Sequence, residues 1–232
     1  MSKVSPAKKI ITLALILALP GFLYYLLVAE GKNRYKPLAI YGPKQVAATS
    51  HIVNGKAIPD TIYHTLTDFN LTDQNGRPVS FKTFDKKIFV VDFFYTHCPT
   101  LCNQVNANMD SLATAWAKNK MVTFVSVTVD PQRDSEPVLS NYAKQFKPSP
   151  NWLFLTGDTA TIYTLARKGL LVDALQAGKD DFIYSNKLIL IDSQKRIRGY
   201  YSGILTNDVS QLNDELKVLI TEELRKDDKP LY

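Results

Sequence analysis

Two cysteines, Cys98 and Cys102, are the residues whose type and spacing most clearly indicate chemistry. They are the only cysteines among 232 residues, and they follow the apolar run KIFVVDFF at 87–94. A chain of this length with 45% hydrophobic residues can bury a full core, so it does not need a disulfide to stay folded. Two such sulfurs can bind one soft metal ion or exchange disulfides with a partner. A structural disulfide in an exported domain is the alternative interpretation.

The surrounding sequence predicts where the two thiols lie. Residues 87–94 are typical of a strand covered on both faces, and residues 102–118 have helical spacing of apolar side chains. Cys98 would then lie at the strand-to-helix junction, where the helix dipole favours a thiolate, and Pro99 suits the first helical turn. Because positions i and i+4 share one helical face, the two sulfurs can meet each other or share an ion. We therefore expect a working dithiol.

The wider pattern predicts an α/β sandwich around a mixed sheet. The turn sequence DQNGRP separates two short extended stretches, and strands then alternate with helices up to a closing hairpin and a last helix. The expected strands are at 121–129, 151–157, 187–192 and 197–203, and the expected helices are at 135–146, 158–169 and 207–224.

The amino-terminal part predicts a membrane anchor. Residues 10–29 are twenty uncharged, mostly apolar positions, long enough to span about 30 Å of hydrocarbon. The net positive charge is somewhat larger before this span than after it. This bias favours a cytoplasmic amino terminus and an exported domain. The predicted organisation is a cytoplasmic segment 1–9, a transmembrane helix 10–29, a tether 30–63 and a globular domain 64–232.

The charge distribution argues against nucleic acid as a partner. Residues 1–36 contain six Lys and Arg residues and one Glu, which is +5 of the total net charge of +6. The remainder is nearly neutral, so the basic character belongs to the flanks of the predicted span. A nucleic-acid-binding domain requires a basic patch of its own.

Three blocks of the sequence resemble one protein family. FFYTHCPTLC, SVTVDPQRDSEPVLSNYAKQF and LILIDSQKRIRGYYSG are similar in order and spacing to the Sco/SenC family, and the resemblance covers about residues 66–223. It implies a thioredoxin-like domain that binds copper through Cys98 and Cys102. It also implies assistance in assembling the binuclear copper centre of cytochrome c oxidase, or reduction of disulfides among the ligands of that centre.

One ligand of the family pattern differs. The resemblance implies a histidine before the LILID strand, and this chain has Tyr184 there, in FIYSNKL. Two thiolates suffice for Cu(I), whereas Cu(II) prefers an imidazole nitrogen, and a neutral phenol replaces imidazole poorly. The copper expected here is therefore Cu(I). Many members of the family have a second proline at the position of Asn103. We expect this difference only to tune the loop.

Other candidate ligands have simpler interpretations. His97 is expected to face away from Cys98, because neighbouring residues at a strand end point to opposite sides. His51 and His64 lie in or near the tether and could fold back over the site, although solvated surface histidines are the expectation. Asp130 and Asp134 are expected to shape a turn, with Asp134 or Ser135 as the helix N-cap. The aromatic residues at 93–95 are expected in the sheet core.

Two functions are compatible with these residues, and a third, weaker option is that the lineage has lost metal handling altogether. The first is a periplasmic copper chaperone on a single inner-membrane anchor, which holds Cu(I) between Cys98 and Cys102 and passes it to the oxidase subunit with the binuclear copper centre. The second is an enzyme, a thiol–disulfide oxidoreductase in which Cys98 attacks a partner disulfide and Cys102 resolves the mixed disulfide. The missing histidine weighs against the first, and the C-x-x-x-C spacing weighs against the second.

Overall fold

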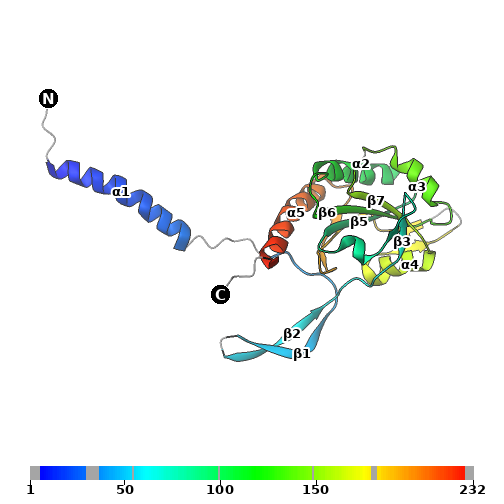
Figure 1. Ribbon diagram of the computed structural model, residues 1–232, viewed down its shortest axis with the longest axis horizontal. Coiled ribbons are helices and arrows are strands. Elements are labelled where there is room, and N and C mark those ends of the chain that lie inside the picture. The colour runs from blue at the N-terminus through cyan, green and yellow to red at the C-terminus, as the bar shows by residue number, and fades with distance from the viewer. Residues whose placement is uncertain are drawn as a thin grey trace. The chain divides into compact units, whose positions relative to one another are not determined.

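The chain divides into two compact units, Met1–Lys36 and Pro37–Tyr232. The computed structural model describes residues 6–29, 37–53, 55–98, 100–147, 149–178 and 182–227 (Figure 1). The first unit contains the helix α1 (Pro6–Ala29), which includes the predicted span. Among the described residues, no helix is both long enough and apolar enough to cross a membrane. The transmembrane helix over 10–29 therefore stays a prediction.

A seven-stranded mixed sheet forms the centre of the second unit, as the sequence predicts. Its strand order is β11-β10-β5-β6-β7-β3-β4, with β5, β6 and β7 parallel and the remaining pairs antiparallel. The strands are β3 (Leu71–Asp73), β4 (Pro78–Val79), β5 (Ile88–Phe94), β6 (Val122–Thr128), β7 (Trp152–Thr156), β10 (Lys187–Ile191) and β11 (Ile197–Ser202).

Helices cover both faces of this sheet, which explains why β5 and β6 are buried at every position. One face packs against α2 (Thr100–Ala115), α3 (Glu136–Ala143) and α5 (Thr206–Asp227). The other packs against the short 3₁₀ helix η1 (Phe81–Phe84), α4 (Thr159–Thr164) and the π-helical turn η2 (Leu165–Gly169). Figure 1 shows α2 and α4 on opposite sides of the sheet. The helices expected at 102–118, 135–146, 158–169 and 207–224 are all formed, with ends shifted by a few residues.

Alternate residues of β5 serve the two cores. Phe89, Val91 and Phe93 belong to the core on the α4 side. Ile88, Val90 and Phe94 belong to the core on the α2 side, and the alternation places the buried Asp92 on that same side. The strand thus delivers a carboxyl group to the face that lies under α2.

Within the tether or extended lead-in predicted at 30–63, residues 44–63 form a hairpin that the sequence analysis did not predict. Strands β1 (Lys44–Val53) and β2 (Lys56–Tyr63) pair antiparallel, and Figure 1 shows the hairpin projecting from the domain. Side chains such as Val46 and Ile52 are more than three quarters exposed. Because the hairpin buries little apolar surface, hydrophobic periodicity does not reveal it. The dipeptide Asn-Gly at 54–55 was the available signal, since Gly55 has a φ of +76°.

A second hairpin, also absent from the sequence prediction, carries Tyr184. Strands β8 (Ala174–Gln176) and β9 (Phe182–Tyr184) pair with Ala174 opposite Tyr184. Phe182 and Ala174 are buried, whereas Leu175 and Ile183 on the other face are half exposed. Each strand has only three residues, too few for a recognisable alternation. The inner face of this hairpin is turned toward the cysteines, as described below.

The first described residues of the second unit are fastened to α5 and β11. Arg198 is 3% exposed and its guanidinium donates to the carbonyl oxygens of Leu38 and Ala39 and to the carboxylates of Asp192 and Glu222. The backbone N–H of Leu38 donates to Glu222 in return. This buried network holds the chain entering the domain against its carboxy-terminal helix.

Candidate functional site: a disulfide at the end of the central strand

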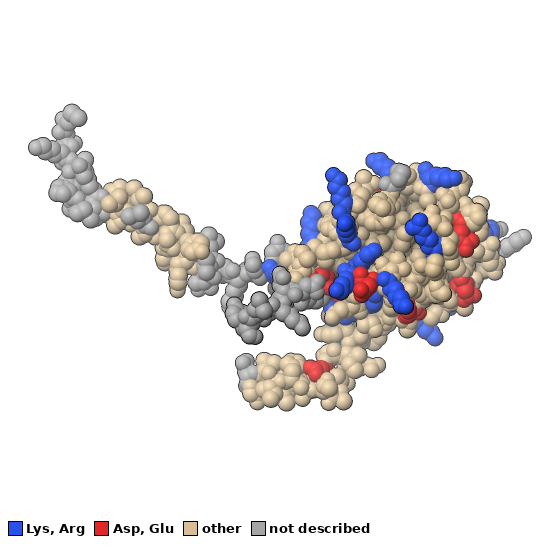
Figure 2. Space-filling model, viewed as in Figure 1, with Lys and Arg blue, Asp and Glu red and all other residues tan. Residues whose placement is uncertain are grey.

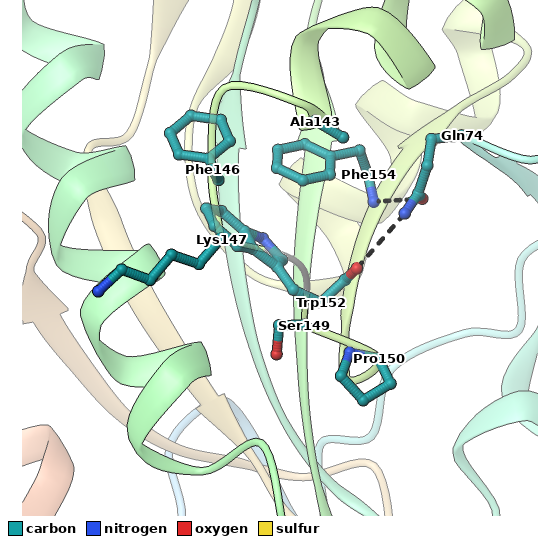
Figure 3. Close-up of a pocket in the computed structure, with 8 residues that line it drawn as sticks. All are labelled: Gln74, Ala143, Phe146, Lys147, Ser149, Pro150, Trp152 and Phe154. Carbon is teal, nitrogen blue, oxygen red and sulfur yellow. Dashed lines mark hydrogen bonds between the residues drawn. The ribbon is translucent and has the colours of Figure 1, made fainter.

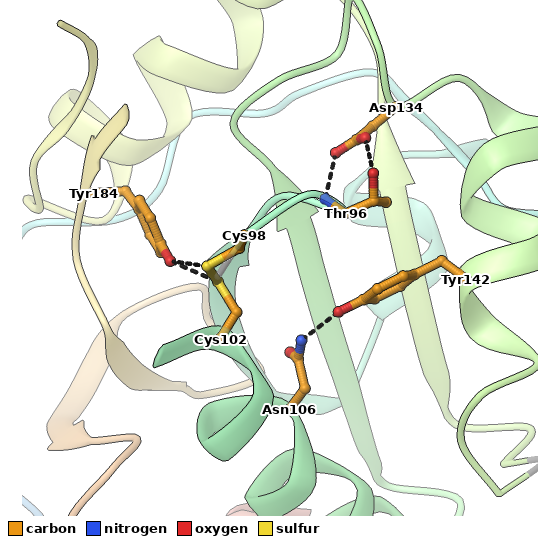
Figure 4. Close-up of a disulfide and its surroundings, with 7 residues drawn as sticks. All are labelled: Thr96, Cys98, Cys102, Asn106, Asp134, Tyr142 and Tyr184. Atoms are coloured by element: carbon orange, nitrogen blue, oxygen red, sulfur yellow. Dashed lines mark hydrogen bonds between the residues drawn. A yellow bond between two sulfur atoms is a disulfide. The ribbon is translucent and has the colours of Figure 1, made fainter. Parts of the chain in front are cut away.

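The two cysteines form a disulfide at the junction between β5 and α2 (Figure 4). Cys98 lies in the loop that follows β5 and is half buried, whereas Cys102 lies in the first turn of α2 and is 2% exposed. Their Cα atoms are 5.9 Å apart. One sulfur is therefore accessible to a partner, and the other is enclosed by the core under α2.

The short loop that this disulfide closes argues for a chemical role. The two cysteines are separated by four positions. In the chain-entropy account a loop this short contributes about 2 kcal/mol of stability, against about 4.7 kcal/mol for a loop of about 100 residues. The sheet and its two cores already provide the stability of the domain, so the disulfide adds little to it.

Tyr184 contacts both sulfurs from the β8–β9 hairpin (Figure 4). Its hydroxyl oxygen lies 2.6 Å from Cys102 Sγ and 3.1 Å from Cys98 Sγ. The disulfide sulfurs carry no hydrogen, so the phenol is the donor in both contacts. The sequence position that the resemblance assigned to a histidine ligand is therefore next to the cysteines in space as well.

The ring of Tyr184 is held by its neighbours. Tyr95 lies edge-on to it at 5.8 Å between centroids, and Tyr95 in turn packs against Phe182 at 5.1 Å. Burial raises the pKa of Tyr184 well above its ordinary value, and the negative charge of Asp92 acts in the same direction. The phenol is thus a neutral hydrogen-bond donor at physiological pH. Tyr95, expected only as sheet core, also supports the site.

Asp134 supports the cysteine loop, and of the two residues predicted as the helix N-cap, Asp134 or Ser135, it is Ser135 that stands at the start of α3. Its buried carboxylate accepts hydrogen bonds from the backbone N–H and the hydroxyl of Thr96, and from the hydroxyl of Thr128. Ser135 occupies the N-cap position of α3 without a side-chain hydrogen bond. Sequence did not reveal these hydrogen bonds of Asp134, because its half-buried partner Thr96 is 38 positions away. Asp130 instead pairs with Arg133 in the turn.

The three histidines make contacts away from the sulfurs. His97 is exposed, and its Nδ1 lies 3.0 Å from the Thr96 hydroxyl oxygen. His51 pairs with Asp60 within the first hairpin at 2.6 Å. His64 Nε2 lies 2.7 Å from the carbonyl oxygen of Gly169. In the residues that the structure describes, the hydrogen bonds to the cysteine sulfurs come from Tyr184 alone.

Asp92 is a fully buried acid on the α2 side of the sheet, and sequence reasoning did not single it out. It accepts a hydrogen bond from the Ser126 hydroxyl, which in turn accepts one from the Trp152 indole N–H. Its second oxygen has no partner among the described residues. Burial raises the pKa of Asp92 to about 7. A charged residue inside the run KIFVVDFF was the available signal.

A separate hollow of about 390 Å³ lies between α3 and the sheet (Figure 3). Its lining includes three aromatic side chains, those of Phe146, Trp152 and Phe154. Gln74 at its edge bonds the backbone of Trp152 and Phe154 and so joins the turn after β3 to β7. Among the described residues that line the hollow, Lys147 is the ionisable one.

Basic and acidic side chains are mixed on one face of the molecule. On the face shown in Figure 2, lysine and arginine side chains are spread over the domain with acidic side chains between them. No continuous basic stripe is visible on that face. The charge pattern there does not resemble a nucleic-acid-binding surface.

The fold and the site together define a thioredoxin-like domain with a cysteine pair at a strand-to-helix junction. A sequence model of the SCO1/SenC family matches residues 60–221, which is more than half of the chain. The chain belongs to the SCO1/SenC family.

Individual relatives agree with this assignment. The SCO1 protein homolog of Bacillus subtilis is 26% identical over 167 residues, covering 70% of this chain and 86% of the relative. The structure of Bradyrhizobium japonicum ScoI with copper bound is 27% identical, with a TM-score of 0.58, and covers 67% of this chain and 99% of ScoI. A structure that identifies a disulfide switch in BsSco, one of the Sco cytochrome c oxidase assembly proteins, is 25% identical with a TM-score of 0.62. It covers 68% of this chain and 94% of BsSco.

We predict that Asp92 makes the stability of this domain fall as pH rises. Its pKa of about 7 lies above the ordinary value of 3.8, so the folded state keeps a proton that the unfolded state releases. The resulting stabilisation is complete below about pH 4 and is lost as pH rises through 7. Between pH 5 and 8 the free energy of unfolding should fall by roughly 3 kcal/mol more in the wild-type protein than in Asp92→Asn.

Denaturant unfolding across this pH range measures the effect. Asp214→Asn is the control, because Asp214 is exposed and only pairs with Lys217 on the surface of α5. This control should keep the wild-type pH dependence. Parallel profiles for the wild type and Asp92→Asn would show that Asp92 is not the titrating group.

Proposed function

We propose that this protein carries Cu(I) between the thiolates of Cys98 and Cys102 and helps to assemble the copper centre of a cytochrome c oxidase. Membership of the SCO1/SenC family supports the oxidase-assembly role, and B. japonicum ScoI has been solved with copper bound. The observation that carries the proposal for this chain is the pair of adjoining sulfurs, one half exposed and one enclosed, with a neutral oxygen beside both.

The donor set favours Cu(I) as the cargo. After reduction the site offers two thiolates, which are soft ligands and suit Cu(I) at low coordination number. The third group within reach is a protonated phenol, which is a poor ligand for Cu(II). The half-exposed Cys98 gives a partner protein access to the bound ion. The partner would be the oxidase subunit that carries the binuclear copper centre.

A second candidate function is thiol–disulfide exchange with a partner protein. The disulfide between Cys98 and Cys102 favours this function, because a dithiol that reduces a partner disulfide is itself oxidised to such a disulfide. In this scheme Cys98 attacks the partner disulfide and Cys102 then attacks Cys98 Sγ to release the reduced partner. A disulfide switch identified in BsSco is a related precedent.

The proposed location is the inner membrane, anchored by residues 10–29, with the domain 64–232 on the periplasmic side and the hairpin segment between them. Lys3, Lys8, Lys9 and the amino terminus precede the span, whereas the three basic residues at 32–36 are partly offset by Glu30, and this bias supports the orientation. A family member from Bacillus anthracis is described as a lipoprotein.

We predict that the reduced protein binds one Cu(I) per chain in competition with a Cu(I) chelator. Replacing Cys98 or Cys102 by Ser removes one of two thiolate ligands, so each variant should lose at least about tenfold in affinity. The titration is run without oxygen on the full chain. If the wild-type protein fails to compete while its thiols are fully reduced, the copper proposal is wrong and the exchange function takes its place.

We predict that Tyr184→His gains affinity for Cu(II). The substitution provides an imidazole nitrogen where the phenol now contacts both sulfurs. The thiolate-to-copper charge-transfer band in the visible spectrum, recorded on reduced protein without oxygen, should be weak in the wild type and strong in the variant. A strong and stable band in the wild type would mean that another residue supplies the nitrogen, with His97 the first to test.

We predict that a reporter active only outside the cytoplasm works when fused after Tyr232. The charge bias around residues 10–29 is the reason. The matched control is the same fusion with Lys3, Lys8 and Lys9 replaced by Gln, which should lower the exported fraction. Activity of a cytoplasmic reporter at the same position would reverse the proposed orientation.

A further inference from the structure

The hydroxyl group of Tyr184 lies where charge develops when the disulfide opens. Cys98 Sγ is the accessible sulfur, so an external thiolate attacks there, and the Cys98–Cys102 bond breaks with its electron pair on Cys102 Sγ. A mixed disulfide forms at Cys98, and Cys102 becomes a thiolate. A second external thiol then attacks the mixed disulfide, which releases the Cys98 thiolate and an oxidised external disulfide. The protein has gained two electrons.

Water cannot solvate the new thiolate effectively, because Cys102 is 2% exposed. A buried charge without a partner is strongly unfavourable, so opening the disulfide requires a donor near this sulfur. Tyr184 Oη is 2.6 Å from Cys102 Sγ, closer than to Cys98 Sγ at 3.1 Å. Figure 4 shows the phenol directed at the sulfur pair from a different element, the β8–β9 hairpin.

We propose that Tyr184 donates its O–H hydrogen bond to Cys102 Sγ as that sulfur departs, and so stabilises the reduced dithiol. The inference rests on the proposed dithiol chemistry of this site and adds a catalytic residue to it. The donor is already in place in the oxidised protein, so the site reorganises little when negative charge forms on Cys102 Sγ. The edge-on contact with Tyr95 and the pairing of Tyr184 with Ala174 hold it there.

This role has a consequence for the balance between the disulfide and dithiol forms. A hydrogen bond to a charged group is about twice as strong as one between neutral groups, and disulfide sulfurs are weak, uncharged acceptors. Tyr184 therefore favours the reduced form over the oxidised form. Tyr184→Phe, which removes only the hydroxyl group, should lower the equilibrium constant for reduction by about tenfold or more. A tenfold change corresponds to about 30 mV for a two-electron couple.

The experiment equilibrates the full chain with buffers of reduced and oxidised dithiothreitol, in the presence of a metal chelator. The disulfide fraction is read by mass spectrometry after rapid alkylation. Tyr95→Phe is the matched control, because it removes the hydroxyl of the adjacent tyrosine and leaves that of Tyr184. We expect Tyr95→Phe within about twofold of wild type and Tyr184→Phe shifted by about tenfold or more.

Tyr184→His is the second variant and keeps an N–H donor at the position. It should stay closer to wild type than Tyr184→Phe does, since a hydrogen-bond donor remains. The proposal is overturned if Tyr184→Phe matches wild type within twofold, or if the His and Phe variants shift equally, because the ring and not the donor would then matter. Failure of reduced wild-type protein to bind Cu(I) would count against the proposed cargo and leave this result unaffected.

Discussion

The carboxylate of Asp134 fixes the point where the central strand ends and the cysteine loop begins. It is buried, and it accepts hydrogen bonds from Thr96 in the loop after β5 and from Thr128 at the end of β6. This one carboxylate thereby joins the parallel strands β5 and β6 to the start of α3. Because the chain is held at Thr96, the next residues must turn toward α2. Cys98 then remains near the surface and Cys102 enters the core.

The second constraint comes from the opposite side of the sulfurs. Tyr184 lies on the β8–β9 hairpin, 82 positions after Cys102 in the chain, and its phenol contacts both sulfurs. A phenol and an imidazole side chain of similar length would interact differently with the two sulfurs and with a metal ion. An imidazole nitrogen is a metal ligand, whereas a protonated phenol donates a hydrogen bond and stays neutral. The site therefore has two soft ligands and one donor, and both functions considered above use the same reduced thiolates.

Polar groups buried beneath α2 link the sheet to this site electrostatically. A hydrogen-bonded chain on the α2 side of the sheet joins Asp92, Ser126 and the Trp152 indole. The helix α2, which covers this side, also carries Cys102. Asn106, one turn further along α2, donates to the Tyr142 hydroxyl. The charge of Asp92 raises the pKa of both Tyr142 and Tyr184, although burial is the larger cause in each.

Sequence alone determined the parts of this protein that depend on local periodicity. Continuous apolar runs marked β5 and β6 because both faces are covered, and the position of Cys98 and Cys102 at a strand-to-helix junction followed from those runs. It did not determine the two hairpins, because they bury few side chains or have strands of three residues. The partnership of Asp134 with Thr96 was decided only by tertiary structure. The family resemblance predicted Tyr184 at the third ligand position, but the contact of its hydroxyl group with both sulfurs came only from the tertiary structure. Residues far apart in the chain make these contacts, and no local pattern encodes a partner that packing of the sheet and helices brings into reach.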